Sequence, residues 1–164
     1  MFNKEVTLKQ IGEYLKRFGW ENFQEVPEPG EKEGIILTGW SLGEGEGHKV
    51  AIDPMVEKGS LLFRAREVAM APLDSTASDR LNGLLLAMAT MNYKMIIGSW
   101  GLDPTDGEVV FTVGMPIGSG DLDYDDFERA LTVLVGSVEV QGRGLKEIIE
   151  GTKTAEQAIA AAGL

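Results

Sequence analysis

The sequence predicts an α+β fold: a single-layer antiparallel sheet, made of a three-strand meander and a hairpin, packed by helices. Three observations support this prediction. Short segments with alternating apolar residues are separated by short turns, which is typical of antiparallel strands. Residues 8–18 and 123–138 show amphipathic helical spacing, and residues 79–93 form a helical pattern that is apolar around most of its circumference. The expected order is α-β-β-β-α-β-β-α, followed by a short helical tail.

The first helix is expected to run from about Leu8 to Phe18. Thr7 precedes it as a suitable N-cap, and Gln10, three residues later, completes a capping box. Gly19 stands where a left-handed C-terminal cap is favoured. The next segment, Glu21–Glu33, is charged and contains two prolines, so we expect a loop there.

Five strands are expected, three in the meander and two in the hairpin, and the second hairpin strand has the clearest apolar alternation. The hairpin is closed by the turn Asp103–Gly107, which has a proline at a favoured position and a glycine where positive φ is easily adopted. The expected strands are residues 34–42, 49–53, 60–66, 94–102 and 108–115.

The central helix is expected from about Asp79 to Tyr93, with several possible N-caps from Ser75 onward. Its main apolar stripe is interpreted as Leu81, Leu85, Met88 and Asn92, and additional apolar residues lie outside that stripe. We therefore expect this helix to contact the sheet on one side and a second helix or a second subunit on the other. The candidate protein-interaction residues are Leu84, Leu86, Met88, Met91, Met95 and Trp100.

A third helix is expected to begin after Asp123, which can cap it. Gly142 and Gly144 are expected to interrupt it, leaving two short helical pieces at Leu145–Glu150 and Thr154–Ala162. The length of 164 residues predicts one domain over 1–164, with a core at about 7–140 and a helical tail at about 145–164.

Charge and composition exclude several functional classes. The net charge of -11 is unfavourable for binding nucleic acid or an anionic membrane surface. The chain has no cysteine, which excludes disulfides and thiol chemistry, and its single histidine, His48, excludes sites built on several histidines. The N-terminal residues form no signal-peptide pattern, and no apolar run is long enough for a membrane span. We therefore expect a cytoplasmic protein without a cofactor.

The acidic residues are concentrated: residues 101–128 contain eight of them and no lysine or arginine. Asp121, Asp123 and Asp125 imitate the start of a calcium loop, but the sixth and twelfth positions hold Asp126 and Thr132 instead of glycine and glutamate. A solvated acidic face and helix capping explain these residues more economically. The remaining alternative is a weak divalent-cation site, used by a metal-dependent enzyme through the cluster between Asp103 and Asp126.

Four segments of the second half carry a family resemblance: the helix Leu81–Leu86, the strand Lys94–Ile97, the turn Asp103–Gly107 and the strand Glu108–Phe111. Together with the element order, they resemble the YbjN family of bacterial proteins with a proposed role in regulating sensory transduction. The resemblance covers about residues 7–140. It implies an α+β fold similar to that of type III secretion chaperones, frequent homodimers and no established catalytic residues.

The resulting hypothesis is a non-enzymatic regulatory or binding protein that recognises another polypeptide, using a groove between a helix and a sheet edge. A homodimer is expected. The close alternative is a secretion-type chaperone that holds a client polypeptide. The metal-dependent enzyme is the lower-ranked alternative, because no nucleophile or base accompanies the acidic residues in the sequence.

Overall fold

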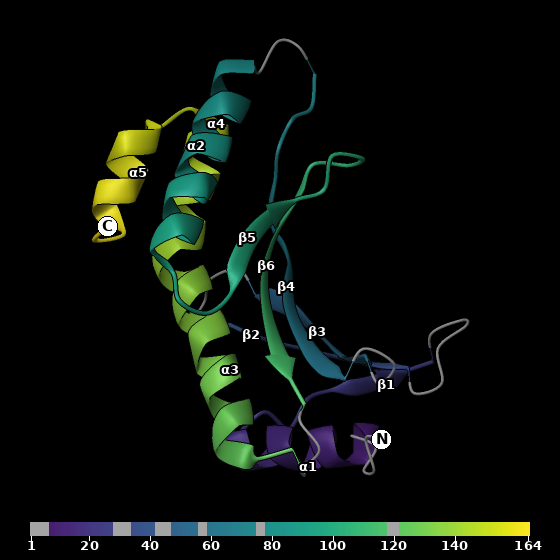
Figure 1. The fold of residues 1–164 in the computed structure, drawn as a ribbon. Helices are drawn as coiled ribbons and strands as arrows, with labels where there is room; N and C mark the ends of the chain where they lie inside the picture. The colour runs from purple at the N-terminus through teal and green to yellow at the C-terminus, as the bar shows by residue number, and fades with distance from the viewer. Residues whose placement is uncertain (1–6, 28–33, 42–46, 56–58, 75–77, 118–121) are drawn as a thin grey trace. The chain divides into compact units, whose positions relative to one another are not determined.

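The structure is a computed structural model that describes residues 7–27, 34–41, 47–55, 59–74, 78–117 and 122–164 (Figure 1). Its strands are β1 (Gln24–Val26), β2 (Ile35–Trp40), β3 (His48–Met55), β4 (Ser60–Met70), β5 (Ser99–Leu102) and β6 (Glu108–Pro116). Its helices are α1 (Leu8–Phe18), α2 (Ser78–Lys94), α3 (Tyr124–Ser137), the π-helical turn η3 (Val138–Gly142), α4 (Arg143–Glu150) and α5 (Ala155–Ala161).

The six strands form one sheet in the order β1-β2-β3-β4-β6-β5. The pairs β1–β2, β2–β3 and β5–β6 are antiparallel, with Ile36 opposite Ile52 and Trp100 opposite Phe111. The predicted α+β class with a single sheet is confirmed. Strand β1 was not predicted. It lies within Glu21–Glu33, where a loop was expected, so that expectation was wrong for the three residues of the strand. Pairing with β2 forms this strand, which has little apolar pattern of its own.

The contacts of the chain divide it into two compact units, each described here by itself. The first comprises residues 1–64 with 113–132, and the second comprises residues 65–112 with 133–164. Strands β4 and β6 and helix α3 contribute residues to both. The expectation of a single domain over 1–164 stays a prediction.

In the first unit, α1 packs on β2, and its buried residues include Ile11 and Leu15. The predicted helix ends are confirmed. Thr7 caps the start through its side-chain oxygen, which accepts a hydrogen bond from the Gln10 N–H at 3.2 Å, and Gly19 ends the helix with φ 95°. The core of this unit is formed by fully buried apolar side chains: Ile11, Leu15, Ile36, Ile52, Phe63, Phe127 and Leu131.

In the second unit, α2 packs against α4, α5 and β5 (Figure 1). Its core includes Trp100 and Phe111, whose rings lie 5.0 Å apart between β5 and β6. Strand β5 begins at Ser99, five residues later than the predicted start at Lys94. Residues 94–98 instead complete the end of α2 and the connection to β5. The apolar run Met95–Ile97 resembled a strand locally, but it has no strand partner in the sheet.

The predicted interruption at Gly142 and Gly144 is wrong. Helices α3 and α4 are continuous through the π-helical turn η3, and Gly142 itself has helical φ -59° and ψ -38°. Both glycines serve close packing instead. A Cβ on Gly142 would lie 3.0 Å from Val68 Cγ1, and one on Gly144 would lie 3.2 Å from Ala158 Cβ. The capping box predicted for the last helix, between Thr154 and Gln157, is confirmed.

Candidate protein-binding surface

Helix α2 has a buried face and an exposed face. The buried residues Leu84, Ala87, Met88 and Met91 follow the spacing i, i+3, i+4, i+7 that is typical of a core-facing helix. The predicted stripe was therefore misplaced. Leu85, one of its members, is 44% exposed: successive helix residues point about 100° apart, so Leu85 lies off the buried face that includes Leu84.

The exposed face of α2 is also apolar. Leu85, Ala89 and Tyr93 follow each other at four-residue spacing, so they are neighbours along the helix surface, and Leu86 lies beside them. Tyr93 is 90% exposed and Leu86 54% exposed. Just beyond the helix, Ile96 is 98% exposed and Ile97 is 42% exposed. We name these residues the outer ridge: Leu85, Leu86, Ala89, Tyr93, Ile96 and Ile97.

The charges around the outer ridge are few. Residues 81–102 contain one charged residue, Lys94, in a chain with net charge -11. Asp79 lies in the first turn of α2 and Lys94 in its last turn, where each complements the helix dipole. The outer ridge is therefore an apolar surface with one charged residue, Lys94, among its positions, and Asp79 and Arg80 both precede it in the first turn of α2.

Exposed apolar side chains are not spread evenly over the described chain. Single exposed hydrophobic residues are normal on a protein surface, whereas contiguous ones mark interaction sites. Among the described residues, every large hydrophobic side chain with substantial exposure belongs to the second unit. These residues are Met70, Leu73, Leu85, Leu86, Tyr93, Ile96, Ile97 and Val140.

The six candidate interaction residues predicted from sequence have different positions. Leu84, Met88, Met91 and Trp100 are buried in the core of the second unit, Met95 is half-buried, and Leu86 alone lies on the outer ridge. Apolarity selected these candidates without fixing the rotation of the helix. The missing signal was helical phase: a buried stripe at 84, 87, 88 and 91 places 85, 86, 89 and 93 on the outside.

The free backbone edge of strand β5 is blocked at Trp100 by the side chain of Asn92. The Trp100 backbone N–H donates to Asn92 Oδ1 at 2.7 Å, and Asn92 Nδ2 donates to the Trp100 carbonyl oxygen at 3.0 Å. The indole Nε1 of Trp100 donates to Gln141 Oε1 at 2.6 Å, which gives this buried glutamine a partner. Because an added strand needs free backbone groups at a sheet edge, a partner strand would have to displace Asn92 here.

The acidic residues have local structural roles. Asp103 Oδ1 accepts hydrogen bonds from the hydroxyl and the backbone N–H of Thr105, and these bonds lower the pKa of Asp103. Asp106 accepts from the Glu108 N–H, and Asp123 accepts from the Asp125 N–H at the start of α3. Asp121 lies outside the described residues. Within the described ranges, no group of three or more histidine, aspartate or glutamate side chains is arranged to hold a metal ion.

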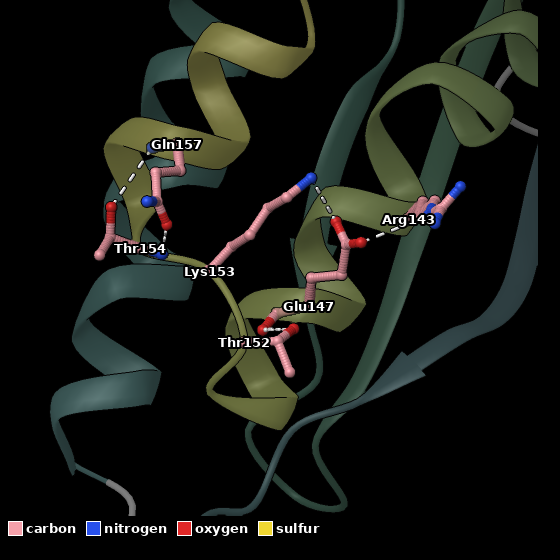
Figure 2. A network of polar contacts seen from close by, with 6 residues as sticks. All are labelled: Arg143, Glu147, Thr152, Lys153, Thr154 and Gln157. Atoms are coloured by element: carbon pink, nitrogen blue, oxygen red, sulfur yellow. Dashed lines mark hydrogen bonds and ion pairs between the residues drawn. The ribbon is translucent and has the colours of Figure 1, made fainter.

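A polar network fixes the connection between α4 and α5 (Figure 2). Glu147 lies at its centre: Lys153 Nζ is 2.8 Å and Arg143 Nε is 3.4 Å from its carboxylate oxygens. The Glu147 carbonyl oxygen also accepts hydrogen bonds from the backbone N–H groups of Thr152 and Lys153 and from the Thr152 hydroxyl. The hydrogen bond from Lys153 is the main cause that lowers the pKa of Glu147.

Replacing Lys153 with methionine should move the pKa of Glu147 upward, because the main interaction that favours its charged form is lost. In the native protein, the pair contributes stability above the ordinary glutamate pKa, and this contribution is lost as the pH falls through the lowered pKa of the folded state. An NMR titration of the Glu147 carboxyl carbon measures the midpoint, with Lys94→Met as the control. An unchanged midpoint in Lys153→Met would contradict the ion pair.

The YbjN family model, described as "Putative bacterial sensory transduction regulator", matches residues 7–139. This match covers most of the chain, so the chain belongs to the YbjN family. No curated protein and no solved structure matches it. Membership supports a regulatory or binding role in general, and the family description names a regulator rather than an enzyme. In the described part of the chain, no helix has the length and apolarity needed to cross a membrane.

Proposed function

We propose that this chain is a non-enzymatic regulatory protein that binds another protein chain through the outer ridge. The observation that carries the proposal is the ridge itself, exposed apolar side chains on α2 and just beyond it, with Lys94 as the one charged residue among positions 81–102. Burying these apolar side chains is favourable by about 25 cal/mol for each Å² removed from water. The apolar side chains themselves carry no ionic group that would have to be desolvated. The most exposed members, Tyr93 and Ile96, are suited to be the anchors.

The partner that fits best is a second copy of the chain. In a two-fold pair the same surface meets itself, and antiparallel α2 helices would place Asp79 of each copy near Lys94 of the other. The helix is 17 residues long, or about 25 Å, so these charges lie at opposite ends of the contact. The same arrangement would bring Ile96 and Ile97 toward the partner's segment before α2, where Met70 and Leu73 are also exposed.

Sedimentation equilibrium of the full chain tests this proposal. We expect Leu86→Asp to weaken self-association by about 100-fold, because a charge would be buried at the contact. Thr132→Asp, at an exposed position of α3 in the first unit, is the matched control and should leave association unchanged. A native chain that stays monomeric up to roughly 100 μM would reject the second copy as the partner.

Charge reversal tests the antiparallel orientation. Asp79→Lys and Lys94→Asp should each weaken association several-fold, because each would place like charges beside one another at both ends of the pair. The double variant restores opposite charges and should recover most of the affinity. Additive losses in the double variant would reject this orientation. The secretion-chaperone hypothesis, with a client polypeptide on the same surface, stays a prediction.

A further inference from the structure

Helix α5 is short, and its fully buried side chains are small. It is seven residues long and packs against α2 and α4, with Ala155 and Ala158 as its buried residues. Helices of this length are not stable alone in water, and the apolar burial of α5 comes from two alanine methyl groups and the half-buried Ile159. The close approach of Ala158 to Gly144 positions α5 without adding much apolar area. The position of α5 therefore depends strongly on the interactions that fix its connection to α4.

That connection is held by the polar network around Glu147. The α4–α5 link turns at Gly151, whose φ is 77°, and the N–H groups and hydroxyl that follow bond back to the Glu147 carbonyl. Lys153 then reaches the Glu147 carboxylate at 2.8 Å (Figure 2). Both side chains are partly exposed, at 34% for Lys153 and 19% for Glu147, although the Glu147 Oε2 that Lys153 contacts is itself buried.

We propose that α5 is a releasable cover on α2, held closed by the Glu147–Lys153 pair, and that its release exposes a further apolar flank of the helix that carries the outer ridge. Release needs only rotation at the Gly151 connection. It breaks no strand pairing, because the elements against which α5 packs are helical. The cover would thus regulate how much of α2 is available. Its link to regulation rests on the proposed function, whereas the release itself does not.

This cover belongs to the part of the chain beyond the family match, which ends at residue 139. Helices α4 and α5 both pack on α2, the helix that holds the ridge. A chain with the matched segment alone would leave this flank of α2 without these two helices. The tail is therefore an element through which this chain can differ from the shared family pattern.

Hydrogen exchange of the full chain, read by mass spectrometry, tests the release. We expect the amides of residues 155–161 to exchange at least 100-fold faster than those of α2, because α5 opens without unfolding the rest. Lys153→Met should accelerate α5 exchange about three- to tenfold and leave α2 unchanged. Arg143→Met is the matched control with the same carboxylate partner, and it should have little effect because Arg143 is 84% exposed.

Exposure of the flank is tested with the dye ANS, which binds apolar surface. Ala158→Asp places a charge at the buried contact and should release α5 fully, so ANS fluorescence should increase several-fold while the circular dichroism of the remaining fold is retained. Equal exchange rates in α5 and α2, or no response to Lys153→Met, would overturn the cover. Failure of self-association alone would reject the second copy as the partner and would not affect this test of α5 release.

Discussion

Replacing Asn92 with alanine is expected to lower the free energy of unfolding by about 2–3 kcal/mol, because two backbone groups of an edge strand lose their partners at once. The side chain of Asn92 accepts from the Trp100 N–H and donates to the Trp100 carbonyl, as a neighbouring strand would. Trp100 is 3% exposed, so water replaces these bonds poorly. The loss should appear in urea denaturation followed by tryptophan fluorescence.

Asn82→Ala is the matched control for this prediction. Asn82 lies on the same helix in an exposed position, so both substitutions change helix propensity by the same few tenths of a kcal/mol. The difference between the two variants therefore isolates the contact with Trp100. Equal stability of the two variants would show that the amide contributes nothing to the edge of β5.

Asn92→Asp separates the two hydrogen bonds. The new carboxylate still accepts from the Trp100 N–H, but it has no proton to donate and repels the Trp100 carbonyl oxygen. When protonated, the carboxyl group can donate to the Trp100 carbonyl and accept from the Trp100 N–H, as the amide does. The fold therefore favours the protonated form, and the pKa of this group in the folded state should rise above about 3.9. The deficit relative to native protein should therefore be small below that pH and grow as the pH rises. A constant deficit across this range would contradict the assigned donor.

The parts of the fold that the sequence predicts correctly are governed by local interactions. Thr7 and Gly19 mark the ends of α1 because a side-chain oxygen and a left-handed glycine satisfy helix ends within a few residues. The Asp103–Gly107 turn is correct for the same reason: Gly107 has φ 83° and donates to the Asp103 carbonyl at 2.9 Å. Each feature is decided by residues that are close in sequence.

The errors concern features that depend on distant residues. Val26 is the one apolar residue of β1, and the strand exists because β2 pairs with it. Met95–Ile97 has strong strand character, but sheet pairing begins at Ser99. Gly142 and Gly144 resemble a helix break, but their small size is required by Val68 and Ala158, which are far away in sequence. Propensity alone does not report such packing.

The interaction surface on α2 stays a prediction, and the structure changes which residues would form it. The surplus of apolar residues in α2 favours a second contact, yet only Leu86 among the six candidate residues is on the outer ridge. Tyr93 and Ile96, the most exposed members, were not chosen. A test of helical phase would have separated 84, 87, 88 and 91 from 85, 86, 89 and 93, although burial of the first set still depends on α4, α5 and β5.

Gly107→Ala is expected to be the most damaging single substitution considered, with a loss of about 3 kcal/mol or more in unfolding free energy. Gly107 adopts φ 83°, where an L-residue costs about 1–2 kcal/mol. Its backbone also docks on the end of β4: Ala71 N donates to the Gly107 carbonyl at 2.8 Å. A Cβ on Gly107 would lie against the Ala71 carbonyl oxygen, far inside van der Waals contact.

Gly136→Ala is the matched control, because it makes the same chemical change with the opposite expected sign. Gly136 is exposed within α3, and a Cβ there would have no neighbour within 4 Å. Alanine should therefore stabilise the helix by about 0.5–1 kcal/mol. The two variants should thus move the thermal midpoint in opposite directions, as measured by calorimetry. If Gly107→Ala proved as stable as the native chain, the turn would be able to move away from Ala71 at no cost in unfolding free energy. The contact of the hairpin with the end of β4 would then not be a source of stability.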